Sequence, residues 1–86
     1  MNWRDKSRTL IEIASAAGNA AAVELADDAR LHFGMACSIR CAKYTSASAK
    51  HDATLLAARE HRAGIKAYRQ AERLLGLAEE SERLAA

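Results

Sequence analysis

The sequence contains no proline, and glycine occurs only four times in 86 residues. These two residues most often interrupt a helix, so their scarcity leaves few possible breaks. Aromatic side chains are also scarce, with one tryptophan, one phenylalanine and two tyrosines. Much of the hydrophobic half of the chain is therefore alanine. We expect one domain, residues 1–86, with a thin core of the kind that a second copy or a partner often completes.

Long apolar runs are missing too, since none reaches the roughly 18 residues that a membrane span needs. The polar opening MNWRDKSR lacks the pattern of a secretory signal. Only two cysteines occur, and we expect a reduced, cytoplasmic protein. There is no glycine-rich phosphate loop and no serine in a strand-to-helix elbow. The sequence therefore predicts a non-enzyme without a cofactor.

Two breaks divide the chain. Gly18 suits the position after a helix and Asn19 suits an N-cap, while Ser46 or Ser48 is a candidate N-cap in the hydroxyl-rich segment YTSASAK. The predicted helices cover residues 3–17, 20–44 and 49–84. This pattern predicts an all-α, three-helix antiparallel bundle with a short first helix and long second and third helices, completed by dimerisation.

The middle helix has apolar residues on two sides, which predicts that it is sandwiched between the other two. One side faces the third helix, and folding about residues 46–47 sets residue 20 opposite residue 73. On the other side, we expect Trp3 to cover Leu31. Apolar areas left without cover usually mark association surfaces, so we predict a homodimer. Its predicted interface consists of Met35, Ile39, Leu74, Leu75 and Leu77.

Cys37 and Cys41 have the i, i+4 spacing that places two thiols on one helix face. Sulfur ligands favour soft ions such as copper(I) or zinc. A structural zinc site needs four ligands, however, and only one close pair exists. We expect two small buried or half-buried hydrophobes and no metal site, with a metal-binding bundle that uses these cysteines as the alternative.

Four polar residues fall on or beside the predicted apolar arcs of the long helices. Glu60 lies beside His61, which the register sets opposite His32. These residues allow a metal or acid–base site, but an unpaired buried carboxylate costs several kcal/mol. We therefore expect Glu60 to pair with a histidine or an arginine across an interface. Arg40 is expected to form an interface ion pair or to extend its charged end to solvent.

The third predicted helix carries five cations at alternating spacings of three and four residues: Arg59, Arg62, Lys66, Arg69 and Arg73. The formal net charge is only +2, so any electrostatic function must be local. The row is either a solvated face or a docking surface for carboxylates or phosphates. We predict a small protein-binding module or inhibitor, of a type known from phages and plasmids by analogy, with an acidic or phosphate-rich partner. The alternative is a nucleic-acid binder in which Gln70 reads a base edge.

Overall fold

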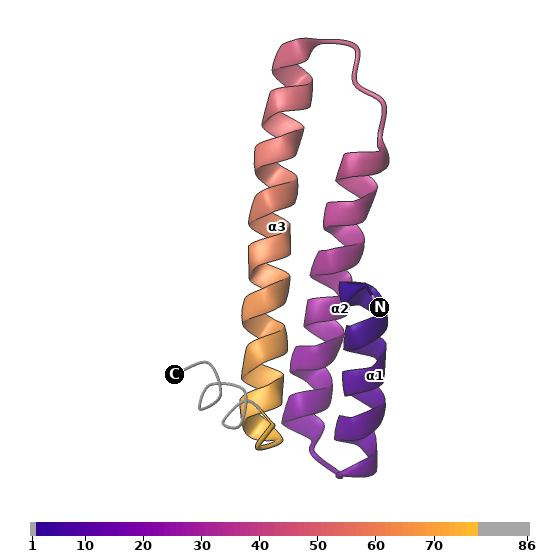
Figure 1. Cartoon of the computed structure of the whole chain (residues 1–86), viewed down its shortest axis with the longest axis vertical. Helices are drawn as coiled ribbons and strands as arrows, with labels where there is room; N and C mark the ends of the chain where they lie inside the picture. Colours follow the sequence, from indigo (N-terminus) through magenta and orange to yellow (C-terminus); the bar gives the residue numbers. More distant parts are fainter. Residues whose placement is uncertain (1, 78–86) are drawn as a thin grey trace.

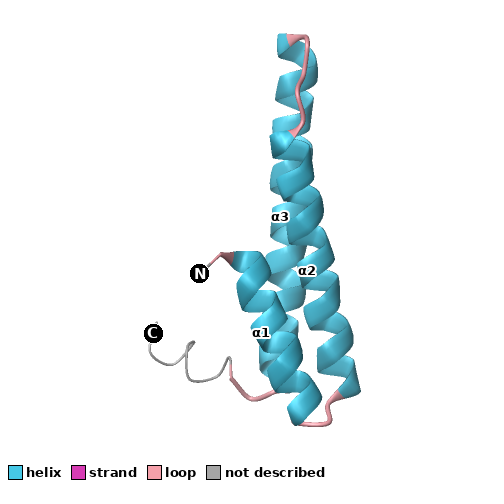
Figure 2. Ribbon diagram, turned by 90° about the vertical axis from the view of Figure 1, so that its right-hand side faces the viewer, coloured by secondary structure: helices cyan, strands magenta, loops and turns pink. Residues whose placement is uncertain are grey.

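The computed structural model describes residues 2–77, which form three helices (Figure 1). Helix α1 spans Trp3–Ala16, α2 spans Ala20–Cys41 and α3 spans Ala47–Leu74. The long helices α2 and α3 form an antiparallel hairpin, and α1 lies against its lower half (Figures 1 and 2). The predicted all-α three-helix antiparallel bundle is confirmed. Above the start of α1 the hairpin continues as a two-helix arm that no third helix covers.

The turn between α1 and α2 follows from the Gly18–Asn19 pair, as predicted. Gly18 has a φ of 68°, a left-handed conformation that favours glycine. Its N–H donates to the Ser15 carbonyl and the Asn19 N–H donates to the Ala14 carbonyl, which closes the end of α1. The Asn19 side chain then accepts from the Ala22 N–H at 3.1 Å and begins α2.

At the other turn, the structure selects Ser46 as the N-cap, because its Oγ accepts from the Ala49 N–H at 3.1 Å. Helix α3 therefore begins two residues before the predicted start at residue 49. Helix α2 ends three residues before the predicted Tyr44. Ala42 is already extended, with a ψ of 149°, and the Tyr44 hydroxyl donates to the Ile39 carbonyl at 2.8 Å.

The prediction that the third helix continues past residue 74 was wrong. Gly76 has a φ of 73°, and the Leu77 N–H donates to the Glu72 carbonyl at 2.9 Å. This is the same glycine-dependent ending that closes α1. Residues 78–84 of the predicted helix lie outside the described residues.

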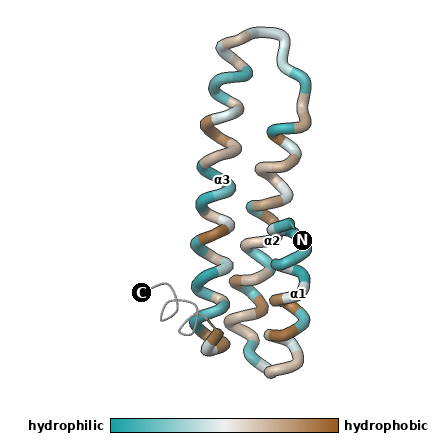
Figure 3. The backbone as a smooth tube through the Cα atoms, in the orientation of Figure 1, coloured by the Kyte–Doolittle hydropathy of each residue, from teal (hydrophilic) through white to brown (hydrophobic). Residues whose placement is uncertain are grey.

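Small side chains allow α2 and α3 to approach closely. Figure 3 shows hydrophobic and hydrophilic bands alternating along α3, as expected for a helix with one buried face. The buried positions of the two helices are Ala22, Ala26, Ala29, Phe33, Ala36, Ala57, Gly64, Ala67 and Ala71. The Asn19 side-chain amide donates to the Leu74 carbonyl at 3.2 Å, which confirms the predicted register to within a residue.

Helix α1 lies over the groove between α2 and α3. Its Leu10 is buried in one cluster with Ala26 of α2 and Ala71 of α3. Trp3 stacks on Phe33, with ring centroids 5.3 Å apart. Leu31, which Trp3 was expected to cover, is 53% exposed. The predicted sandwich was therefore wrong, because α1 and α3 both pack against one broad, alanine-rich arc of α2.

Candidate functional site

The strongest candidate surface is the row of five cations on α3, called here the basic row: Arg59, Arg62, Lys66, Arg69 and Arg73. All five side chains are exposed. They extend for about 21 Å along the helix, at about 1.5 Å per residue. Four of them, Arg62, Lys66, Arg69 and Arg73, border one shallow surface hollow together with Ile65 and Gln70. The row thus combines charge with a slightly concave surface.

Within residues 2–77, carboxylates form no ion pair with four of the five cations in this row. Across residues 2–77, the ion pairs are Arg30 with Asp27 at 2.9 Å and His32 with Glu60 at 2.7 Å. No carboxylate of that range forms an ion pair with Arg59, Arg62, Lys66 or Arg69. Glu60 is next to Arg59 in the sequence but pairs with His32, and Glu72, which follows Arg69 by three residues, does not pair with it. These four cations are therefore available to an external anion.

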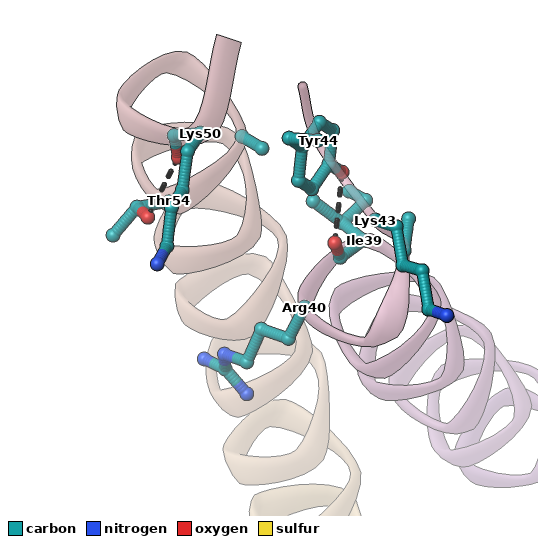
Figure 4. Close-up of a pocket in the computed structure, with 8 residues that line it drawn as sticks. Ile39, Arg40, Lys43, Tyr44, Lys50 and Thr54 are labelled. Carbon is teal, nitrogen blue, oxygen red and sulfur yellow. Dashed lines mark hydrogen bonds between the residues drawn. The ribbon is translucent and has the colours of Figure 1, made fainter. Parts of the chain in front are cut away.

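A second basic surface lies at the end of the arm where α2 is connected to α3. Arg40, Lys43 and Lys50 line a hollow of about 690 Å³, and none of its lining residues is acidic. Figure 4 shows Arg40 reaching from α2 towards α3 and Lys50 lying along α3. The sequence reasoning missed this hollow, although Lys43 and Lys50 flank the predicted break.

Arg40 itself does not form the ion pair considered for it. Its side chain is exposed, and no carboxylate of residues 2–77 lies within ion-pair distance. The arginine borders a small surface hollow together with Asn2, Trp3 and Arg4 at the start of α1. The guanidinium is therefore in contact with solvent, as in the alternative prediction that Arg40 extends its charged end to solvent.

The predicted pairing of Glu60 with a histidine is confirmed, and the partner is His32 of the same chain. Glu60 Oε2 lies 2.7 Å from His32 Nδ1. His61 does not join them, because its ring packs edge-on against Phe33, with centroids 5.3 Å apart, and against Trp3. In the described part of the chain, no three His, Cys, Asp or Glu side chains cluster as metal ligands. The geometry thus offers an interhelical bridge in place of a metal or acid–base site.

The two thiols are not the buried or half-buried hydrophobes that we expected. Cys37 and Cys41 are both exposed, with their Sγ atoms 4.0 Å apart. Cys37 borders a small hollow next to Asn2 and Trp3 at the start of α1, and Cys41 lies one turn farther along α2. The pKa of Cys41 is raised, first by its hydrogen bond with Cys37, then by the charge of that thiol, and last by partial burial.

The residues predicted to form a dimer interface differ in how they are placed. Met35 is 53% exposed on the arm, whereas Leu74 and Leu77 are exposed at the opposite end of the hairpin. Ile39 is half-buried. Leu75 packs against the core cluster of Leu10 in its own chain, so it does not lack cover. Two separate apolar areas remain exposed.

The fold places this chain in the class of all-α three-helix bundles. Comparisons with protein-family models, with curated proteins and with solved structures find no match. None of the helices in residues 2–77 has the length and apolar character required to cross a membrane.

Proposed function

We propose that this chain is a small, non-enzymatic helical module that acts in the cytoplasm as a binding protein or inhibitor. Its basic row docks onto an acidic or phosphate-rich surface of a protein partner. The observation that carries the proposal concerns four exposed cations on one face of α3 that have no carboxylate partner within residues 2–77. They are Arg59, Arg62, Lys66 and Arg69. Planar guanidinium groups bind carboxylates and phosphates through two parallel hydrogen bonds.

The packing of α3 against α2 behind the row favours a docking surface over a face that is only solvated. Like charges three and four residues apart repel by a few tenths of a kcal/mol per pair, so the row lowers the stability of the free helix. Helix α3 tolerates this cost because its opposite face is buried against α2 along Ala57, Gly64, Ala67 and Ala71. A partner therefore meets cations whose backbone positions are already fixed along a helix.

Nucleic acid is the second candidate, because Gln70 borders the same hollow as Arg69 and Arg73. An amide beside phosphate-binding cations is an arrangement that can read a base edge. The net charge of +2 favours the protein partner, since nucleic-acid-binding domains usually carry a stronger basic balance. The experiment below separates the two candidates.

Reversing two charges of the row, Arg62→Glu with Arg69→Glu, should abolish binding to a fluorescent polyglutamate peptide. Binding of the unmodified protein should also weaken steeply with added salt, because the contacts are exposed. Thermal stability should stay unchanged or rise slightly as repulsion within the row is relieved. Fluorescence anisotropy and circular dichroism measure the two effects.

The matched control carries Arg4→Glu with Arg8→Glu, two exposed cations of α1 outside both basic surfaces, and changes the net charge equally. Equal loss of binding in both variants would show that only net charge matters and would contradict the proposal. Titration of mixed-sequence duplex DNA completes the comparison. Binding of DNA without binding of the peptide would replace the proposed partner by nucleic acid.

We also propose that the chain forms a homodimer through the exposed apolar residues of the predicted interface, Met35, Leu74 and Leu77. Light scattering at micromolar concentration should give twice the chain mass. The variant Leu74→Glu with Leu77→Glu should dissociate the dimer, because each leucine loses burial worth about 1.5–3 kcal/mol. Leu55→Glu, at the most exposed large apolar side chain of residues 2–77, is the control and should remain dimeric. A folded monomer for the unmodified protein would contradict this prediction.

A further inference from the structure

The exposed thiol pair has a geometry of its own, independent of the basic row. Cys37 and Cys41 lie one turn apart in the last part of α2, and their Sγ atoms are 4.0 Å from each other. Both cysteines are free and both are exposed. The structure thus presents two sulfur atoms on one face, in contact with solvent.

This geometry does not suit a disulfide. Side chains at i and i+4 of a helix have their Cβ atoms about 5–6 Å apart, whereas a disulfide needs about 3.5–4.5 Å. Closing the bond would draw the sulfurs together to about 2.0 Å and distort the last turn. That turn is intact, since the Ala42 N–H donates to the Ser38 carbonyl at 3.1 Å.

We propose that Cys37 and Cys41 bind a soft monovalent cation of the copper(I) class in linear, two-coordinate geometry. A linear ion separates its two sulfurs by twice the metal–sulfur bond length. The zinc–thiolate bond of about 2.3 Å sets an upper limit of about 4.6 Å, because two-coordinate copper(I) forms shorter bonds than four-coordinate zinc. A small side-chain rotation increases the present 4.0 Å to a separation within that limit. Each thiol releases its proton to solvent as its sulfur–metal bond forms, and no electron is transferred.

Charge and ligand number both select this class of ion. Two thiolates and one monovalent cation carry a net charge of −1, and the guanidinium of Arg40 lines the same small hollow as Cys37. Zinc prefers four ligands, and within residues 2–77 no third His, Cys, Asp or Glu completes a cluster with the pair. Soft thiolate ligands favour copper(I) among the common ions.

The test titrates the reduced protein, without oxygen, with copper(I) held by the coloured chelator bicinchoninate. The protein should remove one copper(I) per chain from the chelator, which is followed by the loss of colour. Cys37→Ser and Cys41→Ser should each weaken binding by more than about 100-fold, since even the loss of an outer-shell partner costs 10–100-fold. Copper binding should also slow the hydrogen exchange of the Ala42 amide, because it fixes the last turn of α2.

A matched variant keeps two thiols but removes their alignment. Ser38→Cys with Cys41→Ser places the thiols at adjacent positions, which point in different directions on a helix. It should bind copper(I) no better than the single serine variants. Equal affinity in this variant and the unmodified protein would overturn the proposal. So would a stoichiometry of one ion for two chains, or zinc binding with the same affinity as copper(I).

Discussion

Gly64→Ala is expected to destabilise the protein, although alanine is the better helix former by about 1 kcal/mol. A Cβ atom at position 64 would lie 2.7 Å from Phe33 Cε1 and 2.9 Å from two further ring carbons. The Phe33 ring cannot move aside, because it is 4% exposed and stacks on Trp3. Overpacking typically costs about 1–3 kcal/mol, and three ring carbons closer than 3.0 Å place this case at the upper end, about 2–3 kcal/mol.

After the gain in helix propensity, we expect a net loss of about 1–2 kcal/mol. That loss corresponds to a melting temperature lower by about 4–16 °C for a domain of this size. Thermal unfolding followed by circular dichroism measures it. In a Phe33→Leu background the penalty should shrink, because the smaller side chain leaves room for the new methyl group.

Gly34 provides the matched control, since it is also a glycine in the interior of a helix. Its nearest neighbour to an added Cβ is Arg4 Nε at 4.0 Å, an ordinary contact with a flexible side chain. Gly34→Ala should therefore stabilise the protein by about 0.5–1 kcal/mol. If both substitutions stabilise equally, the close approach of α2 and α3 at Phe33 is not as described here.

Features that depend on local chemistry could be predicted from the sequence. The Gly18–Asn19 turn needs only a left-handed glycine and an amide that caps the next helix, and both residues perform these roles. The register of the hairpin follows from the position of its turn. The end of α3 depends on equally local chemistry at Gly76. The apolar pattern of the sequence continues past this glycine, and for this reason the end of the helix was not predicted.

Features that depend on how α1 docks could not be predicted in this way. A helical wheel identifies the apolar side of α1, but not which groove of the hairpin receives Trp3. That choice leaves Leu31 exposed and buries the ring contacts around Phe33. The short α1 also covers α2 only up to the level at which Trp3 stacks on Phe33, and Cys37 and Cys41, which follow Phe33, are exposed. The exposure of the basic row was simpler to predict, because it lies opposite the buried side of α3.

The largest loss of stability is expected for Trp3→Ala. The Trp3 ring stacks on Phe33 of α2 and meets Tyr68 of α3 edge-on, with centroids 5.3 Å apart in both cases. It also packs against His61, and Lys6 Nζ lies 4.8 Å from its centroid. The Trp3 side chain thus contacts both other helices. Partial burial of Tyr68 in this cluster raises the pKa of its hydroxyl group, and the charge of Glu72 raises it further.

Removing such a ring costs about 3–5 kcal/mol, a large part of the roughly 4–13 kcal/mol expected for 86 residues. Because Leu10 and Ala14 are the other main apolar anchors of α1, the helix should detach before the hairpin unfolds. Hydrogen exchange should then show amides of α1 losing protection while those around Ala67 in α3 retain more of theirs. Ile13→Ala, at a position of α1 that is 43% exposed, should change stability by less than about 1 kcal/mol. Retained protection of α1 in the Trp3→Ala variant would mean that Leu10 and Ala14 suffice to hold this helix, and that the aromatic cluster is dispensable.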